Sequence, residues 1–477
     1  MKKLMATLIA ASMILGVLSG CGSTTASTEP SGSTADSQAE GGGPGGAPPG
    51  DPPDGNEASG DMPSGGAPGG SSADIDYQGA VEITAADTQD GQIYSSTAAD
   101  ESALLISTAE AVTVTNPTVT KTGDSDGGDN CNFYGLNAAV LVKDGAAAAI
   151  TGGTVTSDAS GANGIFSYGG NGGQNGADGD GTTVSIRDTK IVTTGNGSGG
   201  IMTTGGGVTY AYDLDVTTSG QSSAAIRTDR GGGKVYVDGG RYTSNGLGSP
   251  AIYSTAEIHA ANAVLVSNLS EGVCIEGINS IELTDCDLTA NNTKCNGNAT
   301  FLDSIMIYQS MSGDADSGTS SFTMTDGSLT SKNGHMFHVT NTNAVITLSG
   351  VTLVNEDDGN VLLSVCDDGW SGASNTAALN ANGQELTGAV LVGSNSDLTV
   401  DLSGGSSFTG YIGGSITNAS GASVSTEAGT VSVTLDSAST WTLTGDSYVT
   451  EFNGDAANIA ANGYTLYVNG TALTGTN

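Results

Sequence analysis

Short runs of alternating apolar and polar residues make up most of the chain after about residue 75. Val, Ile and Leu hold the apolar positions of these runs, as at residues 112–114, 184–186, 235–237, 281–283 and 431–433. An alternation with a period of two is typical of strands that bury one face, and no segment keeps the longer period of a helix. Gly, Asn, Asp and Ser cluster between the runs, and these residues tolerate the positive φ angles of tight turns. The pattern therefore predicts an all-β fold built from short strands.

The runs also recur in register. An apolar anchor that follows small residues returns every 23 to 26 residues, with one interval of 36 that contains a glycine-rich insert over residues 169–181; the anchors are Val140, Ile165, Ile201, Ile226, Ile252 and Ile275. Three short strands in about 25 residues are one coil of a parallel β-helix, in which every coil stacks on the last. We therefore predict a right-handed parallel β-helix, a solenoid of roughly 16 coils that each rise about 4.8 Å.

Other repeat folds fit the spacing less well. A β-propeller would need about 40 residues per blade, and the Leu and Asn consensus of a leucine-rich repeat is absent from the sequence. We expect regular coils over residues 73–376 and less regular coils with a cap over residues 377–477. For this last part, a β-sandwich is the alternative.

The first residues have the order of an export signal. A basic start is followed by an apolar run over residues 4–17, which is too short to span a membrane because a spanning helix needs about 20 apolar residues. The run ends in Leu-Ser-Gly-Cys at residues 18–21, which resembles the bacterial lipobox. This resemblance implies a lipoprotein signal peptide over residues 1–20 and a diacylated Cys21. Residues 21–72 are rich in Gly, Pro, Ser and acids, which predicts a disordered tether.

Charge and cysteine content narrow the choice of partners. The chain has 12 basic and 50 acidic residues, a formal net charge of −38. We expect no nucleic acid as a partner, because phosphate binding needs a basic footprint. Without zinc-site or disulfide-framework spacing, most cysteines should lie in solenoid walls, with a pairing among Cys274, Cys286 and Cys295 left open. The six cysteines are Cys21, Cys131, Cys274, Cys286, Cys295 and Cys366.

Calcium is the cofactor that the acidic loops favour. Asp124, Asp126 and Asp129 stand at alternate or near-alternate positions in a Gly-rich turn, and Asp178 and Asp180 form a shorter version. Carboxylate oxygens at such spacings suit a hard cation that takes oxygen ligands. No Glu completes the twelve-residue pattern of an EF-hand, and solvated turns without a metal are the alternative.

The coils resemble the pectin-lyase-like β-helix superfamily. Residues 441–449 (Trp-Thr-Leu-Thr-Gly-Asp-Ser-Tyr-Val) are similar to motifs of autotransporter passengers and adhesin-like solenoids. Together with the lipobox and the tether, the coils also resemble surface lipoproteins of clostridial-type bacteria, some of which bind carbohydrate with calcium. The resemblance implies either a binding solenoid or a polysaccharide-degrading enzyme, although the same fold also serves as an inert stalk.

The catalytic motifs of that superfamily are incomplete here. A lyase would be expected to place a basic residue beside calcium-holding carboxylates, and the nearest constellation is Arg-Thr-Asp-Arg at residues 227–230. A hydrolase would be expected to show paired aspartates and Gly-His-Gly. Aspartates are paired at residues 357–358 and 367–368, but Met336 replaces the glycine that should follow His335. We therefore assign no catalytic residue.

A binding surface is predicted from the residue after each anchor. These residues should face outward in one column, where exposed rings would stack on sugars; the column is Phe166, Met202, Arg227, Tyr253 and Glu276. Stacked coils could also gather a basic island for an acidic polysaccharide, from Arg187, Lys190, Arg227, Arg230, Lys234 and Arg241. The alternative is that these basic residues pair with nearby acids such as Asp188, Asp229 and Asp238.

We therefore predict a monomeric, lipid-anchored protein of the bacterial cell surface that binds a polysaccharide or a host glycan. The predicted binding residues are Arg227, Asp229, Arg230, Lys234, Tyr253 and Phe166. A divergent polysaccharide lyase or hydrolase and a structural stalk or coat protein are the alternatives.

Overall fold

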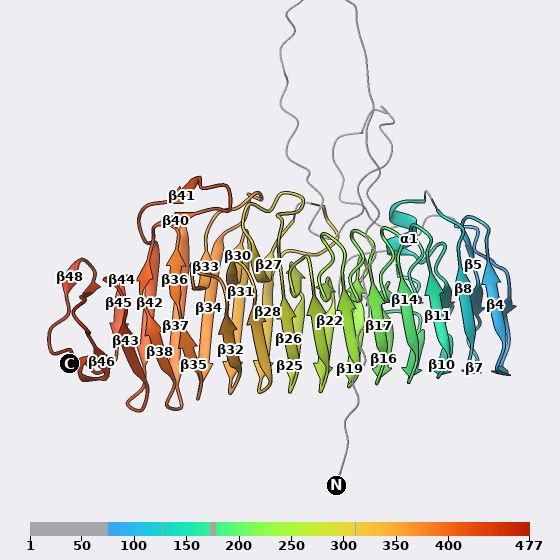
Figure 1. Ribbon diagram of the computed structural model, residues 1–477, viewed down its shortest axis with the longest axis horizontal. Coiled ribbons are helices and arrows are strands. Elements are labelled where there is room, and N and C mark those ends of the chain that lie inside the picture. Colours follow the sequence, from blue (N-terminus) through green and yellow to red (C-terminus); the bar gives the residue numbers. More distant parts are fainter. Residues whose placement is uncertain (1–74, 126, 172–177, 311) are drawn as a thin grey trace, which may run out of the picture. The chain divides into compact units, whose positions relative to one another are not determined.

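Each coil contains three short strands, as the alternating runs predict. One coil consists of β9 (Val140–Lys143), β10 (Ala147–Thr151) and β11 (Thr154–Ser157), and each strand pairs in parallel with its counterparts in the coils before and after. Figure 1 shows the coils stacked side by side in sequence order. The protein is therefore a right-handed parallel β-helix, and the fold prediction is confirmed.

The computed structural model describes residues 75–477 except 126, 172–177 and 311. The expected signal peptide (1–20), the lipidated Cys21 and the tether (21–72) lie outside the described residues. Within them, no helix is long and apolar enough to cross a membrane.

Three long parallel sheets form the walls of the solenoid. The first wall contains β2 (Glu82–Ile83), β6 (Leu104–Ser107), β9, β12 (Ile165–Tyr168), β15 (Ile201–Thr204), β18 (Ile226–Thr228), β21 (Ile252–Ser254), β24 (Val273–Glu276), β27 (Asp303–Tyr308), β30 (His335–Thr340), β33 (Val361–Val365), β36 (Ala389–Val392) and β39 (Ile412–Gly413). The second wall contains β3 (Asp87–Asp90), β7 (Ala111–Thr115), β10, β13 (Thr183–Arg187), β16 (Gly207–Tyr212), β19 (Gly233–Asp238), β22 (Glu257–Ala261), β25 (Ser280–Thr284), β28 (Thr319–Thr325), β31 (Asn343–Ser349), β34 (Asn375–Asn382), β37 (Ser396–Ser403), β42 (Thr430–Leu435) and β45 (Glu451–Asn453).

The third wall contains β4 (Ile93–Ser96), β8 (Thr118–Lys121), β11, β14 (Lys190–Thr193), β17 (Asp215–Thr218), β20 (Arg241–Ser244), β23 (Val264–Ser267), β26 (Asp287–Ala290), β29 (Ser328–Ser331) and β32 (Thr352–Asn355). In the described residues the second wall has 14 strands, somewhat fewer than the roughly 16 coils expected. The difference arises because several coils carry long loops and so use more than 25 residues.

Every turn from the second wall to the third, up to the coil of β37, contains one or two residues with a positive φ. Examples are Asn116 (φ 50°), Asp188 (50°), Asp213 (51°) and Asp285 (51°), and glycine takes this place in other coils. A positive φ strains most side chains, whereas Gly, Asn and Asp adopt it readily. The Gly, Asn and Asp clusters of the sequence therefore mark the corners of the coils.

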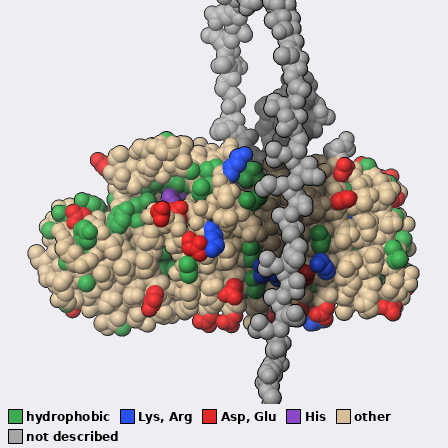
Figure 2. Space-filling model, in the orientation of Figure 1, with side chains coloured by type: hydrophobic (Ala, Val, Ile, Leu, Met, Phe, Trp, Pro, Cys, Tyr) green, Lys and Arg blue, Asp and Glu red, His purple; other side chains and the backbone are tan. Residues whose placement is uncertain are grey.

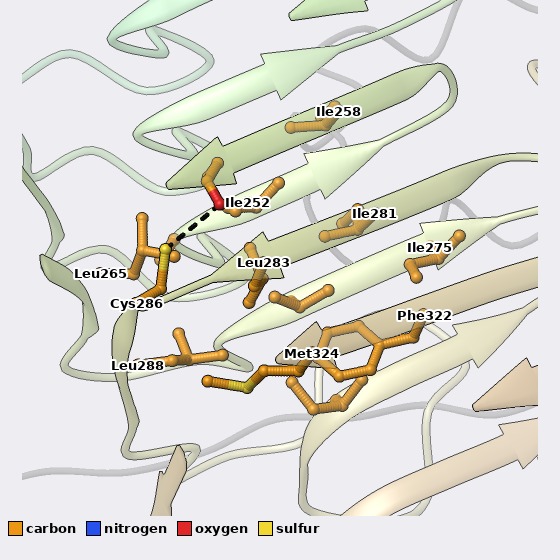
Figure 3. Packing of buried hydrophobic residues seen from close by; sticks show 14 of the residues in the cluster. Ile252, Ile258, Leu265, Ile275, Ile281, Leu283, Cys286, Leu288, Phe322 and Met324 are labelled. Atoms are coloured by element: carbon orange, nitrogen blue, oxygen red, sulfur yellow. Dashed lines mark hydrogen bonds between the residues drawn. The ribbon is translucent and has the colours of Figure 1, made fainter. Parts of the chain in front are cut away.

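The interior is a set of apolar ladders, one rung per coil. Ile201, Ile226 and Ile252 pair in register and are almost fully buried. The next rung is Val273, so the expected anchor Ile275 is wrong by two positions. Both residues point inward, because they are two positions apart in one strand. Figure 3 shows how the three walls contribute to this core.

Most cysteines were expected in the solenoid walls, but among those that the structure describes only Cys274, in β24, lies in a wall strand. Cys131 lies in α1, and Cys286, Cys295 and Cys366 lie between strands. Cys274 and Cys286 are fully buried, and Sγ of Cys286 lies 3.4 Å from the carbonyl oxygen of Ala260 (Figure 3). The five cysteines that the structure describes are all free thiols.

The C-terminal coils continue the solenoid and do not form the alternative β-sandwich. The second wall runs on through β34, β37, β42 and β45, while a four-stranded sheet succeeds the third wall; it consists of β35 (Glu385–Thr387), β38 (Ser407–Gly410), β43 (Thr440–Leu443) and β46 (Ile459–Ala460). The remaining elements are β1 (Gln78–Gly79), β5 (Glu101–Ser102), α1 (Asp129–Phe133), β40 (Ile416–Thr417), β41 (Ser423–Ser425), β44 (Ser447–Val449), η1 (Ala456–Asn458), β47 (Leu466–Val468) and β48 (Thr471–Ala472).

Replacing Ile226 by Asp should destabilise the protein by several kcal/mol, because the dry core offers the carboxylate no partner. The matched control is Ile93→Asp, since Ile93 is 76% exposed and Ile226 is fully buried. Thermal unfolding followed by circular dichroism would show a large loss for Ile226→Asp and almost none for the control. Equal midpoints for Ile226→Asp and the parent would contradict the assigned register.

Candidate functional site

The outer face of the first wall carries the column of side chains that the sequence places outside the core. Neighbouring members pair in register from β12 to β24, and the column is Phe166, Met202, Arg227, Tyr253 and Cys274. Glu276 was expected in this column and instead lies two residues further along β24. The correction follows from the shifted anchor, since Val273 and not Ile275 continues the inner ladder.

The column is buried, which contradicts the expectation that it is exposed. Phe166, Arg227 and Tyr253 are each at most 1% exposed. Loops that enter and leave the first wall fold back over its outer face, and Phe133 of α1 packs in one cluster with Phe166. Trp370, from the loop after β33, packs in a second cluster with Tyr253. A period of two tells which side a residue faces, but it does not tell what covers that side.

Arg227 and Asp229 form a buried ion pair. Nη2 of Arg227 donates to Oδ2 of Asp229 at 2.8 Å, and Nη1 donates to the carbonyl oxygen of Ser222 at 3.0 Å. Nη1 also lies 3.4 Å from Oδ1 of Asn132 in α1. Burial raises the pKa of the Asp229 carboxyl, although the charge of Arg227 opposes this shift. As folded, this pair is out of reach of a surface polymer, and of the lyase constellation over residues 227–230 only Arg230 is partly exposed.

A second buried network ties the loop after β27 to the first wall. Nη2 of Arg230 donates to Oδ1 of Asp314 at 2.7 Å. The carboxylate of Glu276 accepts hydrogen bonds from the hydroxyls of Tyr253, at 2.7 Å, and Tyr308, at 3.1 Å. Burial raises the pKa of the Glu276 carboxyl. Tyr253 and Arg230, which we predicted as ligand-binding residues, therefore contact other parts of the protein.

The six basic residues do not form one island. Arg187 and Lys234 lie in the second wall, and Lys190 and Arg241 lie in the third. Arg227 lies in the first wall, and Arg230 lies in the loop that follows it. Four of them pair with acids, in agreement with the alternative reading, and the pairs are Lys190–Asp215, Arg227–Asp229, Arg230–Asp314 and Lys234–Glu257. Strands that are close in sequence belong to different walls, so closeness along the chain does not bring these side chains together.

Two of the aspartates considered for a hydrolase, Asp357 and Asp367, accept hydrogen bonds that fix nearby loops. Oδ2 of Asp357 accepts from the backbone N–H of Gly334 at 2.9 Å, and its Oδ1 accepts from that of Gly359 at 2.8 Å. Oδ1 of Asp367 accepts from the side-chain amide of Asn375 at 2.6 Å. These bonds use the carboxylates to fix loops.

The acidic turns predicted for calcium also form hydrogen bonds within the protein. Asp124 is exposed, and its Oδ1 accepts from the backbone N–H of Ser160 at 2.7 Å. Asp129 begins the short helix α1, and Asp126 lies outside the described residues. Oδ1 of Asp180 accepts from the backbone N–H of its neighbour Thr182 at 2.9 Å. Among the residues that the structure describes, no three His, Cys, Asp or Glu side chains stand close enough to hold a metal ion.

A group of buried acids lies further along the outer face of the first wall. Asp303 is fully buried, and neither of its carboxyl oxygens has a hydrogen-bond partner in the described part of the chain. Burial raises the pKa of Asp303 well above its usual value, and the nearby carboxyls of Glu271 and Asp368 raise it further. Oδ2 of Asp368 lies 3.4 Å from Nε2 of His338. The loop over residues 291–302 covers this group and donates hydrogen bonds to Glu271 and Asp368.

An open groove of about 710 Å³ lies where the chain passes from the first wall to the second. Its lining comes from the starts of four successive second-wall strands, β16, β19, β22 and β25, from the turn before β13 and from other neighbouring turns. Lys234 lines the groove, as does Asp178, which we predicted as a calcium ligand. Nζ of Lys234 lies 2.9 Å from Oε2 of Glu257, and both side chains are about half exposed.

An aromatic ladder beside the groove was not predicted from the sequence. The rings of Tyr210 and Tyr236 stack at 5.1 Å between centroids, and Tyr236 stacks on His259 at 5.3 Å. Nε2 of His259 lies 2.8 Å from Oε1 of Glu257, which joins the ladder to the Lys234 pair. The three rings occur 26 and 23 residues apart at one strand position. Aligning the second strand of each coil would have found them.

Comparisons of the sequence with family models and with curated proteins, and of the fold with solved structures, found no match. The function must therefore be inferred from the geometry of this chain.

Replacing Asp303 by Asn should stabilise the protein more at about pH 8 than at about pH 4. Because the folded-state pKa is raised, stability falls as the pH rises from the ordinary carboxyl range to the raised value, and Asn removes this loss. Thermal unfolding midpoints at both pH values would measure the difference. Asp397→Asn on the exposed face of β37 is the control. An equal gain for Asp303→Asn at both pH values would show that the buried carboxyl does not titrate as inferred.

Proposed function

We propose that this chain is a lipid-anchored protein of the bacterial surface that binds a polysaccharide along the groove between its first and second walls. The observation that carries the proposal is the direction of the groove, which crosses five successive coils. Coils rise about 4.8 Å, so the crossing measures roughly 19 Å. A trough of that length suits several units of an extended polymer better than one small molecule.

The groove also has the chemistry that sugars require. Lys234 offers a donor for hydroxyl groups, Ser280 offers a donor and an acceptor, and Ile278, which is 52% exposed, offers an apolar contact for a sugar face. Glycines at 206, 232 and 233 leave the backbone accessible along the trough. Tyr236 stacks on Tyr210 with one face and on His259 with the other, so the edge of its ring is what it offers beside the groove.

Charge favours a neutral polymer over a uronate. Three acids, Asp178, Glu257 and Asp316, line the groove with one lysine, and Lys234 already pairs with Glu257. A carboxylated polymer would meet net repulsion there. This proposal replaces the acidic polysaccharide that the expected basic island had suggested.

The likeness to the pectin-lyase-like superfamily is compatible with binding, with catalysis and with a structural stalk. Binding is preferred because the constellations considered for catalysis either lie buried beneath loops or hold turns, whereas the groove is open. We also propose that calcium is needed for this binding, as expected from the acidic turns. Measuring binding with calcium and with EDTA tests this.

The double variant Lys234→Ala with Tyr236→Ala should bind neutral polysaccharide about tenfold more weakly, because it loses both a hydrogen-bonding group and a flank of the trough. Sedimentation with a panel of insoluble and soluble neutral polysaccharides, with calcium or with EDTA, would measure binding. Lys332→Ala is the matched control, since Lys332 forms a similar exposed pair with Glu356 at 2.6 Å. Absence of binding by the parent would contradict the proposal, and unchanged binding by the double variant would place the site elsewhere.

The anchor is tested separately. Cys21→Ala should release the protein from the membrane fraction and abolish its labelling by a fatty-acid probe, because the lipid is the expected attachment. A Cys131→Ala variant serves as the control for loss of a cysteine. Continued acylation of Cys21→Ala would refute the lipobox interpretation.

A further inference from the structure

A second pocket, of about 430 Å³, lies at the C-terminal end of the first wall, apart from the groove. Residues after β36, around the β40–β41 hairpin and next to β44 line it. The side chains that matter are Tyr411, Glu427, Asp446 and Tyr448, and Gly413 also borders the pocket. A volume of this size is typical of sites for small ligands.

Tyr448 presents a bare ring face to the pocket. It is 48% exposed, and one side of its ring stacks on Tyr467 at 5.2 Å between centroids, with the two planes 7° apart. On the other side lies β39, because the backbone N–H of Ile412 donates to Oγ of Ser447 at 3.2 Å. Gly413 follows Ile412 and lines the pocket together with Tyr448, so the pocket lies on that side of the ring.

The ring of Tyr411 forms another side of the pocket, in space that two glycines leave free. A Cβ atom on Gly445 would come within 3.1 Å of Cγ of Tyr411, and one on Gly413 within 3.3 Å of its Cε2. Contacts that short would force the ring to move. The two glycines therefore allow the ring to lie against the backbone beside the pocket.

The lining of the pocket contains two acidic residues and no basic residue. Oδ1 of Asp446 accepts from the backbone N–H of Thr465 at 2.9 Å. Neither Asp446 nor Glu427 belongs to an ion pair in the described part of the chain. Residues 333–477 contain 13 acidic residues and no Lys or Arg. In Figure 2 the end of the solenoid that carries these coils shows acidic side chains and no basic ones.

We propose that this pocket binds a ligand that carries an organic ammonium group. A cation over an open aromatic face is attracted by the ring quadrupole, and uncompensated carboxylates add to that attraction. A bare metal ion would prefer a cage of oxygen ligands to a ring face. A neutral sugar would use the ring but would gain nothing from the charge. The proposal does not depend on polysaccharide binding in the groove.

Two pairs of probes test the charge requirement and identify the source of the ammonium group. The full chain is titrated by calorimetry with choline and its uncharged isostere 3,3-dimethylbutan-1-ol, and with glucosamine and N-acetylglucosamine. We expect the charged member of at least one pair to bind, and its neutral partner to bind at least about tenfold more weakly. Choline binding identifies a quaternary ammonium ligand, and glucosamine binding identifies an amino sugar. Equal binding within each pair, or no binding by either cation, would overturn the proposal.

Variants locate the site. Tyr448→Ala and Asp446→Asn should each weaken binding of the cation about tenfold, whereas Tyr448→Phe keeps the ring face and should bind like the parent. The controls are Tyr464→Ala, because Tyr464 is 43% exposed and lies outside the pocket, and Glu451→Gln on β45. Unfolding midpoints confirm that each variant is folded. Parent-like affinity in folded Tyr448→Ala would also refute the proposal.

Discussion

The solenoid depends on one conformational constraint, which is the positive φ at the corner between the second and third walls. Asn116, Asp188, Asp213 and Asp285 each adopt it in their coils, and in other coils a glycine does so, alone or beside a second residue with a positive φ. Because the corner falls at the same place in each coil, strands on either side begin in step with those of the neighbouring coil. Registered backbone pairing then follows, and with it the apolar ladders of the interior. A coil that turned elsewhere would put its apolar residues on the wrong face.

The loops between the registered strands determine which surfaces of the solenoid are accessible. Loops close over the outer face of the first wall, and buried polar groups fasten them: Arg227 reaches Asn132 in α1, and Arg230 pairs with Asp314 in the loop after β27. Removing one partner of such a pair would leave a buried charge without compensation. Open surfaces include the groove, where the chain passes from the first wall to the second, and the pocket near Tyr448; glycines line both.

More of the fold than of the candidate sites could be predicted from the sequence. Alternation, anchor spacing and corner residues are local signals, and they predicted the walls and the ladder from Val140 to Ile252. The anchor in β24 was wrong because Val273 and Ile275 are both apolar and two positions apart, so periodicity cannot choose between them. Burial of Phe166 and Tyr253 was missed because it depends on loops distant in sequence. Contacts such as Arg230–Asp314, 84 residues apart, leave no local pattern.

The candidate binding surfaces could not be predicted from the sequence because they combine residues from different coils. Tyr210, Tyr236 and His259 become a ladder only after coils of unequal length are aligned, and the pocket beside Tyr448 forms only where residues 411–415, 426–428 and 446–448 come together. Lys234 was found from the sequence, but its neighbours were misidentified, since adjacent basic residues in the chain belong to different walls.

The distribution of basic residues has a further consequence for proteolysis. Proteases of the trypsin type cut after Lys or Arg, and the last such residue is Lys332, directly after β29. Residues 333–477 therefore offer these enzymes no cleavage site, even if they unfold for a time. In surroundings rich in such proteases, the coils that carry the Tyr448 pocket would remain one uncut piece after the basic coils before them had been cleaved.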